Sequence, residues 1–467
     1  PAADPLRASA PPAAAAAARA LPPAAATYSV VGAPPAGSGG PAVDLDAVAA
    51  RLGAALADGG DGLRLARAGR ERWRWRFVDT FDGRLHRAGS TLAAVTGDPR
   101  RPAATRGTRA APSADAPEGW LLWHAADGQL RHAAPWPGDP PAFASDVAAP
   151  AFHAELAALA DPRRLLRLVD VHASVRRYAV VDGDGKTVAR LRLGDGTARL
   201  PRGASLAARP STAEDAPARA ALPPWLDVVG VRGYDAARAR VEAACAALAA
   251  DGVLAPARGS LAARALAALG RPAGGQSGKF DVAIRPDQRA DDAAGQIFQV
   301  LLEAIRTNEA GTRADLDPEF LHDFRVAVRR TRAGLTLLRD ALPPAVVEHF
   351  KAEFGWLGGA TGPTRDLDVY LETMPAYRAA LPSEVASDLG ALEDHLRAKQ
   401  AAAHAALVEA LDSPRYAALL SDWAAALARL RAGGADAPSA AAPIAALAAR
   451  RTWQRFKRIL DDGGRID

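Results

Sequence analysis

The fold of this chain is constrained most by the stretch Leu321–Leu342, with the sequence LHDFRVAVRRTRAGLTLLRDAL. At about 100° per residue, an α-helix here gathers a histidine and several arginines into one stripe. This cationic stripe consists of His322, Arg325, Arg329 and Arg332. A second stripe, about a third of a turn away, is apolar apart from a threonine and consists of Phe324, Val328, Thr331, Leu335 and Leu338. The pattern predicts an amphipathic helix with one cationic side.

The cationic stripe indicates an anion-binding surface. Side chains three or four residues apart on a helix are neighbours, so like charges there repel each other unless an anion neutralises them. Only Asp323 and Asp340 supply carboxylates nearby, and neither lies within the stripe. Arginine forms paired hydrogen bonds to phosphate oxygens, and a protonated histidine adds a donor. A solvated charged face is the alternative, but we favour anion binding. Arg330 flanks the stripe, and Arg339 extends it.

Composition limits the classes of protein to which this chain can belong. With 467 residues, it is long enough for two or three domains with buried cores. A net charge of +5 is small for a protein that coats DNA, so any strong positive potential must be local. The single Cys245 excludes an intrachain disulfide and a cysteine metal cluster, and we expect it in a core.

The sequence shows no signal for export or for a membrane span. A run of about 18 apolar residues, which a spanning helix needs, is missing. Residues 1–26 are rich in Ala and Pro and are expected to form a disordered tail. We therefore expect a cytoplasmic protein with no membrane partner. Because Met374 is the single methionine, we also expect the sequence to be a piece of a longer product.

Residues 27–255 predict an α+β domain. Arg72, Arg74 and Arg76 alternate with aromatic residues, which is typical of a strand with one charged face. Two further strands, Val175–Val181 and Thr187–Leu193, flank a tight turn. The expected helices are Leu45–Ala57, Phe152–Ala160 and Ala236–Ala249, and the expected loops are Pro99–Pro117 and Arg202–Pro217.

Residues 256–286 are expected to form a linker, and residues 287–467 an all-helical domain. Its expected helices are Ala290–Asn308, Pro318–Leu342, Val346–Leu357, Arg365–Glu372, Glu384–Leu411, Arg415–Ala432 and Pro443–Leu460. Gly and Pro predict turns at Pro343-Pro344, Gly358-Gly359, Gly362-Pro363 and Gly433-Gly434. Thr364 is the predicted N-cap of the helix that begins at Arg365, with Asp366 in its first turn.

Three overlapping or successive segments resemble the CHAD family, the conserved histidine α-helical domain. They are NEAGTRADLDPEFLHDFRV, FLHDFRVAVRRTRAGLTLLR and LGGATGPTRDLDVYLE. The resemblance implies an all-helical domain of two pseudo-equivalent bundles that binds inorganic polyphosphate in a basic groove or pore. It assigns this role to His322, Arg325, Arg329, Arg330, Arg332 and Arg365, and the match with the family also carries over to Asp366 and Asp368. It also implies a second His/Arg helix beyond Asp467, so residues 287–467 are expected to be an incomplete first half of the domain. A further implication is association with polyphosphate granules.

The first half of the chain resembles the CYTH superfamily, the triphosphate tunnel fold, in the segments WRFVDTFDGRLHRAGSTL and VDVHASVRRYAVVDGDGKTVARLRLGDG. This resemblance implies a β-barrel with a tunnel. Family enzymes hold divalent metals with glutamates on their first strand, whereas the equivalent Thr27–Gly32 has no carboxylate. We therefore expect a degenerate domain without catalytic residues, metal or cofactor. The face that bears Arg72, Arg74 and Arg76 either lines the tunnel or is a solvated outer face.

The last segment predicts a second basic helix. Arg451, Arg455 and Arg458 share one of its faces, and Trp453, Phe456 and Leu460 share another. We expect the basic face to join the wall of the anion site. Elsewhere, Asp366 and Asp368 point in different directions on a helix, which favours salt bridges to neighbouring arginines over a shared metal ion.

The sequence thus predicts a non-catalytic protein that binds inorganic polyphosphate. The cationic stripe has no aromatic residue on which a base could stack, which makes nucleic acid a weaker candidate. Two alternatives stay open. One is a metal-dependent triphosphatase that uses the CYTH-like domain, and the other is the binding of nucleic acid or an acidic protein by the same stripe.

Overall fold

The computed structural model describes residues 24, 26–31, 44–97, 119–126, 128–201, 218–271, 282–382, 386, 388–433 and 436–464. The loops expected at Pro99–Pro117 and Arg202–Pro217 lie outside the described residues, as does nearly all of the expected tail. The chain divides into two units, Pro1–Gln276 and Ser277–Asp467, which we call the sheet unit and the helical unit.

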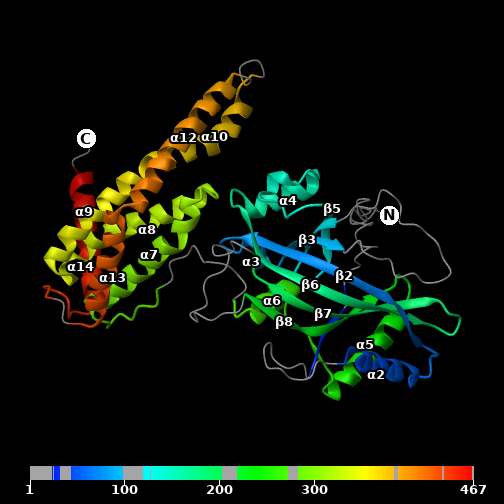
Figure 1. Ribbon diagram of the computed structural model, residues 1–467. Helices are drawn as coiled ribbons and strands as arrows, with labels where there is room; N and C mark the ends of the chain where they lie inside the picture. The colour runs from blue at the N-terminus through cyan, green and yellow to red at the C-terminus, as the bar shows by residue number, and fades with distance from the viewer. Residues whose placement is uncertain are drawn as a thin grey trace. The chain divides into compact units, whose positions relative to one another are not determined.

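The sheet unit contains one antiparallel sheet of nine strands in the order β5-β4-β3-β2-β6-β7-β8-β1-β9 (Figure 1). The strands are β1 (Ala26–Val30), β2 (Arg64–Thr80), β3 (Thr91–Gly97), β4 (Gly119–His124), β5 (Leu130–Pro135), β6 (Leu165–Val181), β7 (Thr187–Arg199), β8 (Arg219–Gly230) and β9 (Leu254–Pro256). The predicted hairpin is confirmed as β6 and β7, which pair from Asp170 with Arg199 to Val181 with Thr187. Both strands are longer than the hydrophobic pattern indicated.

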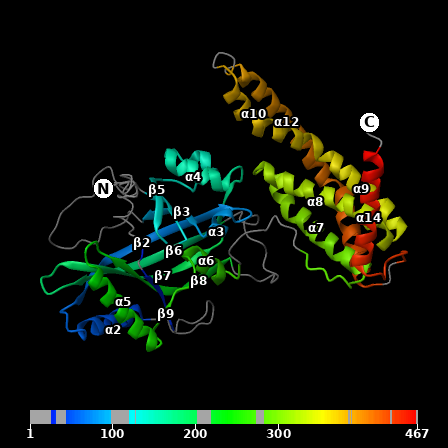
Figure 2. The same cartoon turned by 180° about the vertical axis from the view of Figure 1, so that it is seen from behind.

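Helices cover different parts of this sheet. They are α2 (Leu45–Ala57), α3 (Arg84–Arg87), the 3-10 helix η1 (Ala144–Asp146), α4 (Pro150–Ala160), α5 (Asp235–Ala250) and α6 (Leu261–Ala268). Helices α2 and α5 lie side by side and share a core with β6 and β7 (Figures 1 and 2). Cys245 is buried in that core, as predicted, and burial raises the pKa of its thiol to about 12.

Helix α6 corrects the prediction of a linker at residues 256–286. Ser260 caps the helix by accepting a hydrogen bond from the Ala263 N–H at 3.2 Å. Ala265 and Leu266 then pack into the core formed by the middle of the sheet. The helix is short, but its apolar side has a sheet to cover, so this part of the chain belongs to the sheet unit.

The fold class is confirmed: an antiparallel sheet with helices is followed by an all-helical part. Among the strands that the structure describes, β5 and β9 each have a single hydrogen-bonded neighbour and form the two edges of the sheet. Closure into a tunnel, which the CYTH resemblance implies, therefore stays a prediction.

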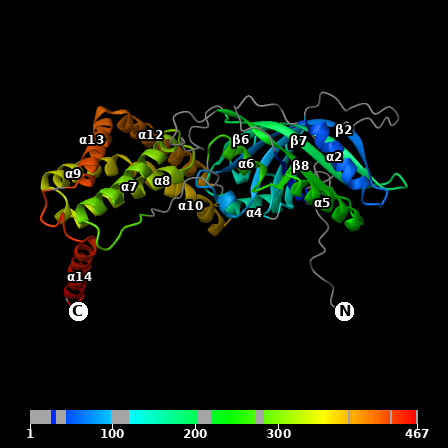
Figure 3. The same cartoon turned by 90° about the horizontal axis from the view of Figure 1, so that it is seen from below.

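The helical unit consists of α7 (Ala290–Arg313), α8 (Pro318–Leu337), the 3-10 helix η2 (Arg339–Ala341), α9 (Pro344–Ala360), α10 (Gly362–Ala380), α12 (Leu389–Asp412), α13 (Pro414–Arg431) and α14 (Ile444–Gly463). Trp423 lies at the centre of its core, with ring centroids at 5.2 Å from Phe298, 4.5 Å from Phe350 and 5.5 Å from Phe354. Helices α10 and α12 form a long antiparallel hairpin that extends beyond the other helices of this unit (Figures 1 and 3). No described helix is both long and apolar enough to cross a bilayer.

Three local predictions in the helical unit are wrong. Gly358 and Gly359 lie within α9 rather than in a turn, and α10 begins at Gly362. A single residue, Thr361, separates the two helices, and its hydroxyl donates to the Gly358 carbonyl at 3.0 Å. Thr364 is therefore buried in the first turn of α10 instead of capping it, and Asp366 lies beyond that turn.

Candidate functional site

Helix α8 positions the cationic stripe. The carboxylate of Asp317 caps the helix by accepting hydrogen bonds from the backbone N–H groups of Glu319 at 3.0 Å and Phe320 at 3.3 Å. The predicted apolar stripe is buried: Phe324, Val328, Thr331 and Leu335 are at most 1% exposed, and Leu338 packs against the same core. Burying this side fixes the rotation of α8, and hence the direction of its cations.

The other side of α8 holds its cations at different depths. His322 and Arg325 are half-buried, whereas Arg329, Arg330 and Arg332 are exposed. Among the described residues, neither Arg329 nor Arg332 has a carboxylate within ion-pair distance. The structure thus keeps uncompensated cations on the stripe, as an anion site requires.

Arg325 also has a structural role. Its Nη1 donates to the Thr361 hydroxyl at 2.8 Å and to the Gly358 carbonyl at 3.2 Å, so it ties α8 to the junction between α9 and α10. Burial lowers the pKa of Arg325, the nearby Asp366 carboxylate raises it, and Arg365 and Arg329 lower it further. Arg329 and Arg365 are therefore close enough to Arg325 for their positive charges to repel its own.

Two glycines lie beside the guanidinium groups, and at one of them, Gly358, a Cβ atom would be tight. A Cβ atom on Gly358 would lie 3.2 Å from Nη1 of Arg332, and one on Gly362 would lie 3.8 Å from Nη1 of Arg325. At Gly358, a larger side chain would occupy space that the guanidinium of Arg332 now fills. The two glycines therefore form the floor beneath part of the stripe.

Helix α10 carries Arg365, whose charge is already neutralised by an ion pair with Glu372 of the same helix. Its Nη1 lies 3.2 Å from Oε1 of Glu372, and its side chain is only 14% exposed. Asp368 is buried and accepts a hydrogen bond from the Gln400 amide at 3.0 Å, rather than forming the expected salt bridge to an arginine. Burial raises the pKa of Asp368 to about 6, although the Gln400 hydrogen bond acts in the opposite direction.

A pocket of about 710 Å³ continues from the C-terminal end of the stripe. It is lined by Arg332 of α8, Arg339 of η2 and Lys351 of α9, together with the carboxylates of Asp340 and Glu348. Lys351 was not predicted as a site residue. Its only sequence signal was its rarity, since arginine supplies most of the 58 cations of the chain, and rarity alone does not place a residue beside α8.

Helix α14 does not line this pocket, but two arginines in its first half contact Asp340, which does. Arg451 lies 2.8 Å from Oδ1 of Asp340, and Arg450, which was not predicted, donates to Oδ2 of the same carboxylate at 3.1 Å. Arg455 and Arg458 lie further along α14 and are exposed. Within the described part of the chain they form no hydrogen bond or ion pair, so the structure does not bring them to the cationic stripe.

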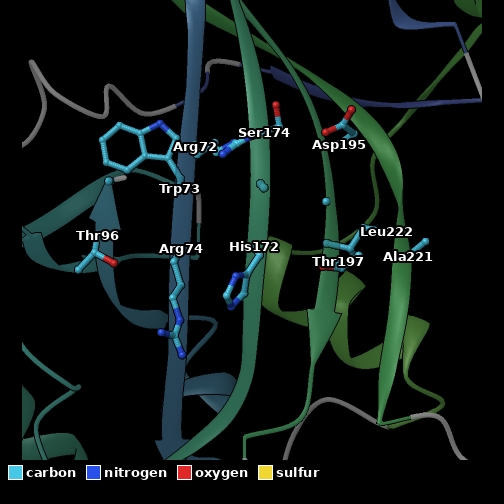
Figure 4. Close-up of a pocket in the computed structure, with 13 residues that line it drawn as sticks. Arg72, Trp73, Arg74, Thr96, His172, Ser174, Asp195, Thr197, Ala221 and Leu222 are labelled. Atoms are coloured by element: carbon cyan, nitrogen blue, oxygen red, sulfur yellow. The ribbon is translucent and has the colours of Figure 1, made fainter. Parts of the chain in front are cut away.

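Two of the three arginines predicted on β2, Arg72 and Arg74, lie at a separate pocket of the sheet unit, and Arg76 is not among the residues that line it. This pocket has a volume of about 660 Å³ and is lined by five neighbouring strands, with Arg72 and Arg74 of β2 beside His172 of β6 (Figure 4). Arg74 forms a 2.7 Å ion pair with Asp170. Burial and then the Arg74 charge lower the pKa of His172. The described residues include no cluster of three or more His, Cys, Asp or Glu side chains that could hold a metal ion.

A family model described as CHAD domain matches residues 296–467, which include α8 and the cationic stripe. Residues 296–467 form a CHAD domain. The predicted resemblance of the helical part is thereby confirmed, whereas the CYTH-like character of the sheet unit stays a prediction.

Two solved structures are similar to part of the chain. The crystal structure of the CHAD domain from the plant Ricinus communis shows 27% identity over 40% of this chain and 60% of that chain, with a TM-score of 0.34. PptA from Streptomyces chartreusis shows 22% identity over 38% of this chain and 61% of that chain, with a TM-score of 0.31. The chain thus spans about 60% of the length of each. No curated protein matches it.

Proposed function

We propose that the CHAD domain of this chain binds inorganic polyphosphate along the cationic stripe of α8. One observation supports this proposal above the others: Arg329 and Arg332 are exposed on one side of a rigidly packed helix, and no described carboxylate compensates them. Arginine pairs held in that way repel each other until an anion lies between or along them.

A linear phosphate polymer suits this arrangement better than a compact anion. Cations follow one another from His322, Arg329 and Arg332 on α8 to the pocket that Arg339 of η2 and Lys351 of α9 line together with Asp340 and Glu348. A polymer with one charge per phosphate can follow such a line and gains from the release of its counterions. The exposed positions of the stripe include no aromatic side chain for base stacking, which distinguishes this ligand from single-stranded nucleic acid.

Not every predicted residue contributes in the same way in this proposal. Arg329, Arg330 and Arg332 contact phosphates, while Arg325 and His322 line the half-buried side. Arg365 and Arg451 already neutralise acidic side chains, so they add less. The sheet unit has no catalytic part in this proposal.

The proposal is tested by titrating the chain with fluorescently labelled long-chain polyphosphate at several salt concentrations. We expect log K to fall linearly with log salt, by a slope that counts the phosphates contacted. Unlabelled polyphosphate should displace the label far better than single-stranded DNA or RNA of equal charge. Equal displacement by nucleic acid would contradict the proposal. Phosphate release from tripolyphosphate that depends on Mg²⁺ or Mn²⁺ would instead favour the triphosphatase.

A further inference from the structure

Helix α10 brings a cation beside the cationic stripe. The hydroxyl of Thr361 accepts a hydrogen bond from Arg325 at 2.8 Å, and a Cβ atom on Gly362, the first residue of α10, would lie 3.8 Å from Nη1 of Arg325. Arg365 follows within the next turn of the helix. Burial lowers the pKa of Arg325, and the positive charge of Arg365 lowers it further. Of the two arginines in α10, Arg365 and Arg378, Arg365 is thus the one that can extend the stripe.

A carboxylate of the same helix holds this cation. Nη1 of Arg365 donates to Oε1 of Glu372 at 3.2 Å, and Nη2 donates to Oε2 at 3.4 Å. The two residues are seven positions apart, which is two turns and about 10 Å along the helix axis, so the guanidinium leans towards Glu372 and away from the start of α10. Asp368 lies between them on the same side of α10, but it is buried and already accepts the hydrogen bond from Gln400. Glu372 is thus the carboxylate that occupies Arg365.

The ion pair between Arg365 and Glu372 does not join two helices, since both residues belong to α10. In contrast, Arg415 of α13 pairs with Glu353 of α9 at 2.8 Å and so ties two helices together. The Glu372 side chain is 31% exposed, and partly exposed pairs of this kind contribute little to stability. The main effect of Glu372 is therefore on the charge that Arg365 can offer to a ligand.

We propose that Glu372 acts as a built-in counterion that withholds Arg365 from polyphosphate bound along the cationic stripe. This inference rests on the proposed function. The carboxylate occupies the guanidinium edge that a phosphate would otherwise use, because both anions bind arginine through paired hydrogen bonds. Glu372 is tethered to the same helix and is present at a high effective concentration, which a free phosphate does not reach. It thus limits both the affinity and the number of phosphates that the protein contacts.

The inference is tested with Glu372→Gln, which keeps the size of the side chain and removes its charge. We expect labelled long-chain polyphosphate to bind about fivefold more tightly at low salt, and log K to depend on log salt more steeply by about 1, because one more phosphate is neutralised. The titration is made at pH 8, because Asp368, whose pKa burial raises to about 6, is then ionised with or without Glu372. The melting temperature should hardly change, because the pair lies within one helix.

Two controls separate the release of Arg365 from a general loss of negative charge. Glu393→Gln makes the same change in net charge on α12, where Glu393 pairs with Arg378 and Arg397. Arg378 lies 13 residues beyond Arg365, about 20 Å along α10, and the screening length is about 10 Å at 0.1 M salt, so affinity should change by less than about twofold. The second control adds Glu372→Gln to a chain that already carries Arg365→Gln, where no cation is left to release and no gain in affinity is expected.

Three results would overturn the inference while leaving polyphosphate binding itself intact. The first is that Glu372→Gln brings no gain in affinity. The second is a gain that persists without Arg365, because the general loss of a negative charge would then explain it. The third is a gain without a steeper salt dependence, because the polymer would then already contact Arg365 in the unchanged chain. A chain that does not prefer polyphosphate to nucleic acid would instead overturn the proposed function, and this inference with it.

Discussion

The sheet unit and the helical unit both display rows of arginines, but the two rows are in different electrostatic states. On the sheet, Asp170 accepts ion pairs from Arg74 and Arg167, each at 2.7 Å, and Arg76 donates to the Gly138 carbonyl at 2.6 Å. On α8, Arg329 and Arg332 have no such partner among the described residues. The density of cations is therefore a poor guide to an anion site. The better guide is whether the protein has already neutralised them.

Reversing charge on α8 should have the largest effect. The double variant Arg329→Glu/Arg332→Glu is expected to weaken polyphosphate binding about 100-fold and to reduce the salt dependence of log K by about 1 per arginine. Both side chains are exposed, so the melting temperature should hardly change. The measurement is a titration with labelled polyphosphate. Lys399→Glu/Arg429→Glu, at exposed cations on α12 and α13, makes the same change in net charge and should retain most of the affinity.

The same kind of change on the sheet should affect stability instead of binding. Arg74→Leu leaves the buried Asp170 with Arg167 as its remaining partner, and we expect the sheet unit to lose about 2 kcal/mol of stability. Urea denaturation measures this loss. Polyphosphate affinity should stay within twofold of the unchanged chain. A large loss of affinity would move the anion site to the pocket of the sheet unit and reverse the comparison.

Two buried carboxylates extend the comparison to pH. Burial raises the pKa of Asp368 to about 6, so its ionisation opposes folding above that pH and ceases to do so as pH falls towards 3.8. Asp368→Asn should therefore stabilise the helical unit by about 1–2 kcal/mol near pH 8 and by almost nothing near pH 4. Thermal denaturation at both pH values measures this difference.

Asp170 provides the matched control for the pH experiment. Burial pushes its pKa up, but the hydrogen bonds from Arg167 and Arg74 outweigh burial and lower it overall. Its ionised form therefore supports folding above the unfolded pKa, and this support is lost as pH falls through the lowered value. Asp170→Asn should destabilise at neutral pH. If both asparagine variants changed stability in the same direction at pH 8, the assigned difference between the two carboxylates would be wrong.

The smallest effects are expected at the floor of the stripe. Gly358→Ala places a Cβ 3.2 Å from Nη1 of Arg332, so the guanidinium must shift by a few tenths of an ångström. We expect polyphosphate affinity to fall two- to threefold. Stability should instead rise, by up to about 1 kcal/mol, because alanine favours the interior of a helix. Gly359→Ala, with no atom within 4 Å of its new Cβ, should raise stability without changing affinity.

Local patterns predicted α8 well because its rotation depends on which side is apolar, and that side is explicit in the sequence from Phe324 to Leu335. The same reasoning failed at Gly358 and Thr364, because glycine was taken as a turn signal although Gly358 lies within α9, where the guanidinium of Arg332 packs against it. Likewise α6 was taken for a linker, because its apolar side is too short to predict a buried helix until the sheet that it packs against is known.

The composition of the site was harder to predict than its central helix. Contacts such as Arg325 with Thr361, Arg365 with Glu372 and Arg451 with Asp340 depend on which helices meet, and the sequence around α8 does not specify this. As a result, the predicted set treated compensated and uncompensated arginines alike. Lys351 and Arg450 were missed for the same reason.

The hydrogen bond between Arg325 and Thr361 connects the cationic stripe of α8 with the junction between α9 and α10. Thr361 is the sole residue between α9 and α10, and it is therefore one of the two places where the chain enters or leaves the long α10–α12 arm, the other being Ser413 between α12 and α13. The Thr361 hydroxyl accepts a hydrogen bond from the guanidinium of Arg325. The row of cations and the arm are therefore joined by a direct hydrogen bond, so a change in the position of Arg325 is felt where α10 begins.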